Sequence, residues 1–418
     1  MRANLGQGAA RREDALSAQR GAGRSAKKGR MPQPRSASFR LPRRFAIAVA
    51  LCLLLGAAVE ARRSAGQTKD GPARMTKQAP APPAAWACAA RAGFRAGRWP
   101  AGCWRPYSAR SPFNRRIGAD PRLHPRSARI VSWLARVGPP AKSAAGVADT
   151  SDDWGKPTYY ARRSDPVFTV HCSEDWGRCP IEGHRLRIPD KARAAAGGDA
   201  HMTVVEQASG WGYDFWRVRS KPRGGGRITI SWGGRTRLDG DGLGSGATAA
   251  GFGGLAGIIR AEELERGRID HALFMTIRCD AARSVYPSQG TGRRCSTVGG
   301  SEKDAAPMGA RFQLAMSERE IGALSVPPWK KTILTAMARY GMYFGDTGGE
   351  TWGIQFESGS TYTSFGHDDR LVAYARKAQV PTWEAPTGAR HYVFDLAAGV
   401  DWQRRLRVIH PCVSRGRC

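Results

Sequence analysis

The sequence lacks the short motifs that mark the common catalytic and cofactor-binding sites. It contains no G-x-S-x-G nucleophile elbow, no phosphate-binding loop with its lysine, no C-x-x-C pair and no EF-hand calcium loop. The glycine-rich runs 224–226 and 242–257 have no strand–loop–helix context suited to a nucleotide phosphate. We therefore expect no cofactor and no metal, and function has to be inferred from the less specific features below.

Long apolar runs are also scarce. The run 45–59 has 15 residues and follows Arg40, Arg43 and Arg44, and Val59-Glu60-Ala61 offers acceptable residues at −3 and −1 of a cleavage site. This arrangement is typical of a secretory signal peptide, since a membrane span needs about 20 apolar residues. An uncleaved N-terminal anchor is the alternative, and the sequence does not decide whether translation starts at Met1 or Met31.

Acidic side chains are few: 35 Asp and Glu stand against 66 Lys and Arg, a formal net charge of +31. Residues 1–78 hold 17 of the basic and 4 of the acidic residues, so part of the excess lies before the expected folded region. The charge favours an anionic partner such as an acidic polysaccharide, a phosphate-rich wall polymer or a nucleic acid. A dispersed basic surface is the other interpretation, and no nucleic-acid-binding motif is present.

Eight cysteines follow the apolar run, an even number that is typical of exported proteins. Their order suggests four local disulfides, although eight cysteines allow 105 pairings. The suggested pairs are 88–103, 172–179, 279–295 and 412–418. We expect a secreted or cell-surface protein.

Three regions follow from composition: residues 1–61 are a basic extension with the signal peptide, 62–83 a Pro/Ala-rich disordered linker, and 84–418 one β-rich, disulfide-containing domain. Helical patterns cover 127–137, 260–266 and 328–340. Strand patterns are more numerous. They cover 166–172, 202–206, 212–218, 227–232, 272–278, 340–344 and 351–357, and the last two are expected to form a hairpin across 345–349. Because strands outnumber helices and do not alternate with them, we predict a mainly β fold. The predicted form is an antiparallel two-sheet sandwich, jelly-roll-like, with a few covering helices.

Four segments resemble a group of secreted bacterial proteins that share them in the same order. They read A-T-A-A-G, I-D-H-A-L, A-P-M-G-A-R-F-Q-L (306–314) and I-L-T-A-M-A-R-Y-G-M-Y-F-G-D (333–346). The resemblance covers about 199–346 and implies that this stretch is one domain, but it carries over no activity and no site residue. One departure is the turn 251–255, which is richer in glycine here than in the group.

The stretch 199–273 holds most candidate catalytic side chains. His201 begins the strand 202–206, and Tyr213 and Asp214 lie on adjacent positions of the next one. In a hairpin, His201 would lie near Tyr213 or near Asp214, depending on register. A His–Tyr pair could act as base and acid in sugar-acid elimination. The structural alternative is a strand-end histidine and a buried tyrosine with satisfied hydrogen bonds.

Asp241 and His271 complete the catalytic candidates. Asp239 and Asp241 lie in a glycine turn, and paired carboxylates can cleave a glycosidic bond when about 5–10 Å apart. A plain turn, in which the carboxylate caps backbone amides, is the alternative. His271 would need a carboxylate other than its neighbour Asp270, because adjacent strand residues face opposite ways.

Substrate-binding candidates are aromatic or charged residues near these positions. An exposed tryptophan beside a carboxylate can stack on a sugar ring and bond its hydroxyls, which singles out Trp352 and Asp346. Trp211 and Arg217 lie on the strand that carries Tyr213.

Two functions are compatible with these features. The first is a secreted carbohydrate-active enzyme, a hydrolase or lyase, acting on a polysaccharide that the basic composition suggests is anionic. The alternative is a non-catalytic, secreted or surface-attached protein that binds a glycan or wall polymer. Convergence of the polar candidates in one open site favours the enzyme, and their separate burial favours the binding protein.

Overall fold

The computed structural model describes residues 94–137, 142–145 and 150–418, except 96, 151, 350, 386 and 387; for 142–145 it describes the backbone only. Residues Ala87–Cys418 belong to one compact unit. The predicted signal peptide and linker lie outside the described residues. No described helix is long and apolar enough to cross a membrane.

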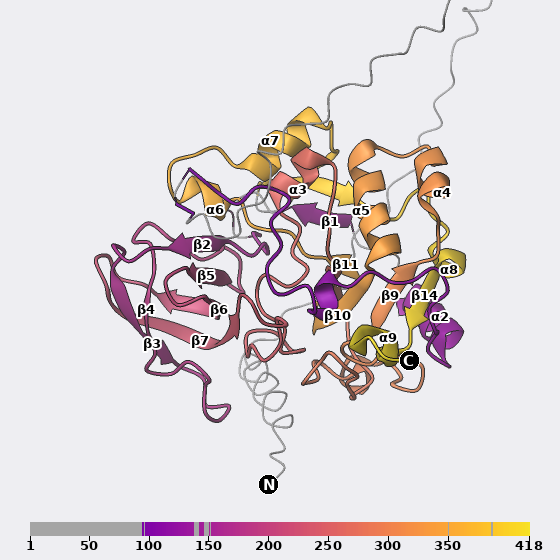
Figure 1. Cartoon of the computed structure of the whole chain (residues 1–418), viewed down its shortest axis with the longest axis horizontal. Helices are drawn as coiled ribbons and strands as arrows, with labels where there is room; N and C mark the ends of the chain where they lie inside the picture. The colour runs from indigo at the N-terminus through magenta and orange to yellow at the C-terminus, as the bar shows by residue number, and fades with distance from the viewer. Residues whose placement is uncertain are drawn as a thin grey trace, which may run out of the picture. The chain divides into compact units, whose positions relative to one another are not determined.

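A six-stranded sheet contains the first part of the candidate stretch (Figure 1). Its order is β2 (Thr158–Ala161), β5 (Met202–Glu206), β6 (Trp211–Ser220), β7 (Gly226–Arg237), β3 (Val167–Cys172) and β4 (Arg185–Arg187). The pairs β5–β6 and β6–β7 are antiparallel, whereas β2–β5 and β3–β7 are parallel. The strands predicted over 202–206 and 212–218 are present and pair with each other.

The second sheet has five strands. Its order is β11 (Gly353–Ile354), β8 (Leu273–Ile277), β10 (Met342–Thr347), β9 (Arg311–Leu314) and β14 (Leu406–Ile409). Helices α2 (Ser127–Val137) and α5 (Pro328–Arg339) bury their apolar faces in the same core as these strands. Both helices occur where the 3.6-residue periodicity predicts them.

The remaining elements are shorter. Strands β1 (Lys142–Ala145), β13 (Arg390–Asp395) and β12 (Thr382–Glu384) form an antiparallel sheet. The other α-helices are α3 (Ala261–Arg266), α4 (Glu318–Ala323), α6 (Ser360–Thr363), α7 (Arg370–Lys377), α8 (Trp402–Arg405) and α9 (Pro411–Arg415). Two 3₁₀ turns cover Pro112–Asn114 and Cys295–Val298.

The prediction of a strand-rich fold is therefore supported, but the antiparallel two-sheet sandwich is not confirmed, because two of the three sheets are mixed. The expected hairpin of 340–344 with 351–357 is wrong. Strand β8 lies between β10 and β11 and pairs with both of them, in parallel with β10. A local turn signal at 345–349 does not reveal this, since the inserted partner comes about 70 residues earlier in the chain.

Three predicted local disulfides are present: Cys172–Cys179, Cys279–Cys295 and Cys412–Cys418. Cys103 is also disulfide-bonded, and its expected partner Cys88 lies outside the described residues. Disulfides of this kind are consistent with an extracellular protein.

Candidate functional site

The register of β5 and β6 decides which candidate residues share a face. Thr203 lies opposite Asp214, and Val204 lies opposite Tyr213. Since side chains alternate along a strand, His201 and Thr203 share one face with Asp214, and Tyr213 projects to the other. The expected His201–Tyr213 pair is therefore not formed, whereas His201 and Asp214 do lie on one side.

Asp214 is buried and fully hydrogen-bonded. Its Oδ1 accepts from the Thr203 hydroxyl at 3.1 Å, and its Oδ2 accepts from the Ser245 hydroxyl at 2.8 Å. The Gly254 backbone N–H is a further donor, although burial is the larger effect and raises the pKa of this carboxyl. A Cβ at Gly254 would lie 2.3 Å from Asp214 Oδ1, so only glycine brings its N–H this close. Through Ser245 and Gly254, Asp214 thus hydrogen-bonds the glycine-rich loop 242–257 to the six-stranded sheet.

Lys156 is the residue that sequence reasoning missed. It precedes β2, its backbone N–H donates to Phe356 O, and only 4% of the residue is exposed. Its Nζ lies 4.3 Å from the centre of the Phe274 ring. Within the described part of the chain the ammonium makes no hydrogen bond and no ion pair. Burial lowers the pKa of Lys156, and the charges of Asp346, Asp214 and Asp199 oppose that shift.

Asp346 reaches this lysine because of a bulge in β10. The pairing of β10 with β8 shifts between Phe344 and Asp346, which leaves Gly345 as the extra residue. A bulge of this kind re-aims the side chain that follows it. A Cβ at Gly345 would lie 2.3 Å from the Phe274 ring, so the bulge requires glycine.

Asp346 is held on both oxygens by backbone amides: Thr347 N–H donates to Oδ1 at 2.8 Å, and Ala249 N–H donates to Oδ2 at 3.4 Å. Burial raises the pKa of Asp346 to about 6, and the positive charge of Lys156 moderates the rise. The carboxyl therefore titrates near neutral pH, in the range suited to proton transfer.

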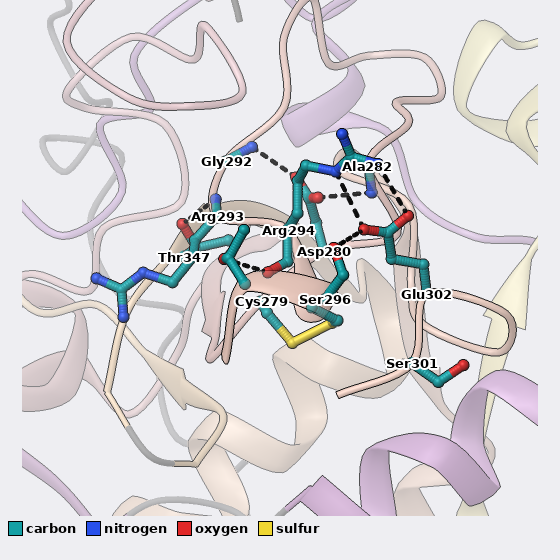
Figure 2. The surroundings of a disulfide bond; sticks show 12 residues. Cys279, Asp280, Ala282, Gly292, Arg293, Arg294, Ser296, Ser301, Glu302 and Thr347 are labelled. Atoms are coloured by element: carbon teal, nitrogen blue, oxygen red, sulfur yellow. Dashed lines mark hydrogen bonds and ion pairs between the residues drawn. A yellow bond between two sulfur atoms is a disulfide. The ribbon is translucent and has the colours of Figure 1, made fainter. Parts of the chain in front are cut away.

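The disulfide loop beside β10 contacts Thr347, the residue after Asp346 (Figure 2). Thr347 Oγ1 accepts from Arg293 N–H at 2.9 Å, and Asp280 Oδ2 accepts from Gly292 N–H. Arg293 lies in the segment that the Cys279–Cys295 disulfide closes, so Thr347, the neighbour of Asp346, is hydrogen-bonded to a covalently closed loop.

His201 and Asp199 lie close together, and both side chains are partly accessible to solvent. The His201 Nε2 lies 3.8 Å from Asp199 Oδ2, and the two side chains are 15% and 39% exposed. Burial, followed by the charge of Lys156, lowers the pKa of His201 to about 4, so its ring is neutral at neutral pH. Ala200 and Arg217 next to them have φ of 38° and 51°, a region where residues other than glycine carry strain.

We refer to Lys156, Asp199, His201, Asp214 and Asp346 as the Lys156 cluster. Two tryptophans flank its exposed edge. Trp154 is 53% exposed, and its ring lies over Gly198, where a Cβ would be 3.5 Å from the indole. On the other side, Trp216 Nε1 donates to Asp199 Oδ1 at 3.1 Å. Aromatic faces beside proton-transfer groups are an arrangement that suits sugar rings.

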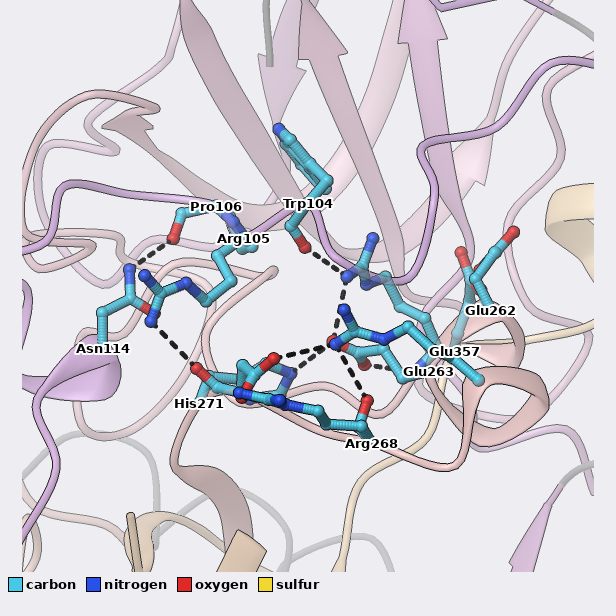
Figure 3. Close-up of polar contacts among 12 residues, drawn as sticks. Trp104, Arg105, Pro106, Asn114, Glu262, Glu263, Arg268, His271 and Glu357 are labelled. Carbon is cyan, nitrogen blue, oxygen red and sulfur yellow. Dashed lines mark hydrogen bonds and ion pairs between the residues drawn. The ribbon is translucent and has the colours of Figure 1, made fainter. Parts of the chain in front are cut away.

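Asp241 and His271 do not join the cluster. Asp241 Oδ1 accepts from Leu243 N–H at 3.0 Å, which makes it a turn residue. His271 is buried, its Nδ1–H donates to Ala272 O at 2.9 Å, and its Nε2 lies 3.0 Å from Glu263 Oε1 (Figure 3). Glu263 is also paired with Arg260. His271 therefore has a carboxylate partner other than Asp270, but that partner belongs to a buried structural network.

The remaining candidates, Tyr213, Trp211 and Trp352, also lie outside the Lys156 cluster. Tyr213 is buried, and its side chain is hydrogen-bonded to that of Arg235, the residue opposite it on β7. Trp211 is partly exposed, with the Arg235 guanidinium 4.3 Å from its ring centre. Trp352 is wrong as a sugar platform, because it is only 2% exposed and packs edge-on against Trp402 at 5.1 Å.

The clearest surface depressions lie elsewhere. One is lined by aromatic and basic residues, Tyr159, Tyr160, Phe365, Arg95 and Arg162 among them, and the other by Arg376, Arg390 and Tyr392. Neither is lined by a residue of the Lys156 cluster, in which Lys156 and Asp214 are buried and the side chain of Asp199 is 39% exposed. Comparison with family models, with curated proteins and with solved structures finds no match to this chain.

Proposed function

We propose that the protein is a secreted carbohydrate-active enzyme that cleaves a polysaccharide, as a hydrolase or a lyase, at the Lys156 cluster. The carrying observation is the buried Lys156 ammonium, which makes no hydrogen bond among the described residues and whose charge influences the pKa of the Asp346 carboxyl. Burial shifts the pKa of both groups toward their neutral forms. Buried ionisable groups with shifted pKa values that influence one another are typical of functional sites.

Both reactions need a proton donor to the glycosidic oxygen and a proton acceptor. Asp346, with a pKa of about 6, is the proposed donor. The neutral ring of His201 is the proposed acceptor, since 15% of its side-chain surface is exposed and Asp199 lies 3.8 Å from it. In a hydrolase the acceptor takes a proton from water; in a lyase it takes the proton next to a sugar carboxylate.

Export is supported by the disulfides and by the apolar N-terminal run with its preceding arginines. A place in the group of secreted bacterial proteins that share the four segments is part of the same proposal. The second candidate, a non-catalytic glycan-binding protein, is favoured by the separation of Tyr213, Asp241 and His271 from the cluster. It is also favoured by the exposed Trp154, which can carry a sugar ring without chemistry.

The test is a panel of acidic and neutral polysaccharides with two readouts, new reducing ends and absorbance from unsaturated sugars. We expect product from the wild type and about 100-fold less from Asp346→Asn, the loss typical of a missing acid or base. The matched control is Asp239→Asn, since Asp239 is exposed and bonds only Arg237 among the described residues. Retention on a polysaccharide without products would favour the second candidate instead.

A further inference from the structure

Three tryptophans form an exposed surface next to Asp199. The ring of Trp176 stacks on Trp216 with centroids 5.3 Å apart and an interplanar angle of 28°, and lies 5.6 Å from the ring of Trp232. Trp176 is 38% exposed, and the other two are partly exposed. We call these three residues the tryptophan shelf.

The shelf is built on rigid parts of the chain. Trp216 and Trp232 lie opposite each other on β6 and β7. Trp176 lies in the loop that Cys172–Cys179 closes, and Ser173 and Glu174 of that loop donate backbone hydrogen bonds to β7. Rings fixed in this way lose little conformational entropy when a ligand binds.

Arg217 supplies a free charge at the shelf. Its guanidinium carbon lies 4.6 Å from the centre of the Trp216 ring, and the residue is partly exposed. Within the described part of the chain this guanidinium makes no hydrogen bond and no ion pair. Neighbouring Arg219 differs, because it is paired with Glu174 at 3.3 Å. A stacked, unpaired guanidinium is suited to bind a carboxylate through two parallel N–H groups.

The shelf and the Lys156 cluster share Asp199. Its Oδ1 accepts from Trp216 Nε1 at 3.1 Å, and its Oδ2 faces His201 Nε2 at 3.8 Å. A chain of sugars that passes over the shelf would therefore reach the proton-transfer groups at the next position. Apolar rings with one cation at their edge suit an acidic sugar, which has an apolar ring face and a carboxylate.

We propose that the tryptophan shelf and Arg217 bind a uronic-acid unit of an acidic polysaccharide, one position away from the cleaved bond. This inference rests on the proposed function and adds the substrate class and the residues that select it. Trp176 supplies the stacking surface, and Arg217 recognises the carboxylate.

The experiment is affinity electrophoresis of the full chain in gels that contain a polyuronate or an uncharged glucan. The Asp346→Asn protein is used as the parent, so that the gel is not degraded. We expect retention by the polyuronate and about tenfold weaker binding after Trp176→Ala, the loss typical of a central aromatic anchor. Arg217→Gln should lose most of the preference for the polyuronate over the glucan.

Trp383→Ala is the matched control, because Trp383 is 53% exposed and lies on β12, outside the shelf. Trp176→Phe is a second variant, in case Trp176→Ala unfolds the loop. Because phenylalanine keeps a stacking ring, Trp176→Phe should retain part of the binding of the parent. Equal retention of Trp176→Ala and parent, or equal binding to both polymers, would overturn the proposal.

Failure of the two proposals can be told apart. Shelf-dependent retention with no product from the wild type would sustain the shelf and refute the enzyme. Product from a polyuronate with a KM unchanged by Trp176→Ala and Arg217→Gln would sustain the enzyme and refute the shelf.

Discussion

Thr203 and Asp214 face each other across β5 and β6, and the Thr203 hydroxyl donates to Asp214 Oδ1 at 3.1 Å. Together with Ser245 and Gly254, this contact uses both oxygens of the carboxylate. Asp214 is therefore a structural member of the Lys156 cluster, and Asp346 is the member proposed as the proton donor.

Asp214→Ala is expected to destabilise the protein by about 2–4 kcal/mol, because it leaves buried donors without an acceptor. Urea unfolding followed by tryptophan fluorescence measures the change. Asp239→Ala, at an exposed position, should stay within about 0.5 kcal/mol of the wild type. Wild-type stability combined with lost activity in Asp214→Ala would show that Asp214 is catalytic after all.

Gly345→Ala tests the bulge that aims Asp346. Its Cβ would meet the Phe274 ring at 2.3 Å, so we expect a loss of about 1–3 kcal/mol from overpacking, and a larger loss of activity as Asp346 moves. Thermal unfolding and product release are measured on the same samples.

Gly348→Ala is the control for that variant, since a Cβ at Gly348 would meet nothing within 4 Å. Equal behaviour of the two alanine variants would mean that the position of Asp346 does not depend on the bulge.

The sequence predicted the parts of the site that local patterns encode. Period-two alternation gave β5 and β6, and the order of the cysteines gave the loop that carries Trp176. It did not predict Lys156, because residues 150–157 have no periodicity. The position of this lysine depends on contacts with residues about 200 positions later, such as the bond from its N–H to Phe356 O.

The sequence also did not predict which tryptophan side chains are buried and which are exposed. Trp352 follows a glycine turn and was expected to be exposed, yet packing against Trp402 buries it. Trp176, Trp216 and Trp232 were not singled out, although they are the tryptophans that stack at the surface. Only the register of β6 against β7 brings the last two together.

The pH dependence of the rate tests the role of Asp346. As a proton donor with a pKa of about 6, it should give a rate that falls as pH rises through this value. The charge of Lys156 lowers the pKa of Asp346, so Lys156→Met should raise that pKa and move the falling limb to higher pH. The measurement is kcat/KM against pH for both proteins.

Methionine keeps the length of the lysine side chain without its charge, and Lys191→Met, at an exposed position, controls for the loss of a cation. If the falling limb of kcat/KM lies at the same pH in the wild type and in Lys156→Met, the charge of Lys156 does not influence the pKa of Asp346.

Glu357 and Glu262 make the stability of the protein depend on pH. The Tyr362 hydroxyl lies 2.8 Å from Glu357 Oε2 and 3.2 Å from Glu262 Oε1, but it has one hydrogen to donate. Arg370 pairs with Glu262, which leaves Glu357 to carry a proton. Burial, reinforced by the charge of Glu262, raises the pKa of Glu357 to about 8.

A raised carboxyl pKa contributes stability below the unfolded-state value, and this contribution is lost as pH rises toward 8. We therefore expect the wild type to lose stability between about pH 5 and 8, and Glu357→Gln, which has no proton to lose, to lose at least about 1 kcal/mol less. Urea unfolding at several pH values measures this. Glu384→Gln, at an exposed position of β12, should follow the wild type. Parallel curves for Glu357→Gln and the wild type would mean that Glu357 is already ionised in the folded protein, with Arg260 and Arg370 together compensating both carboxylates.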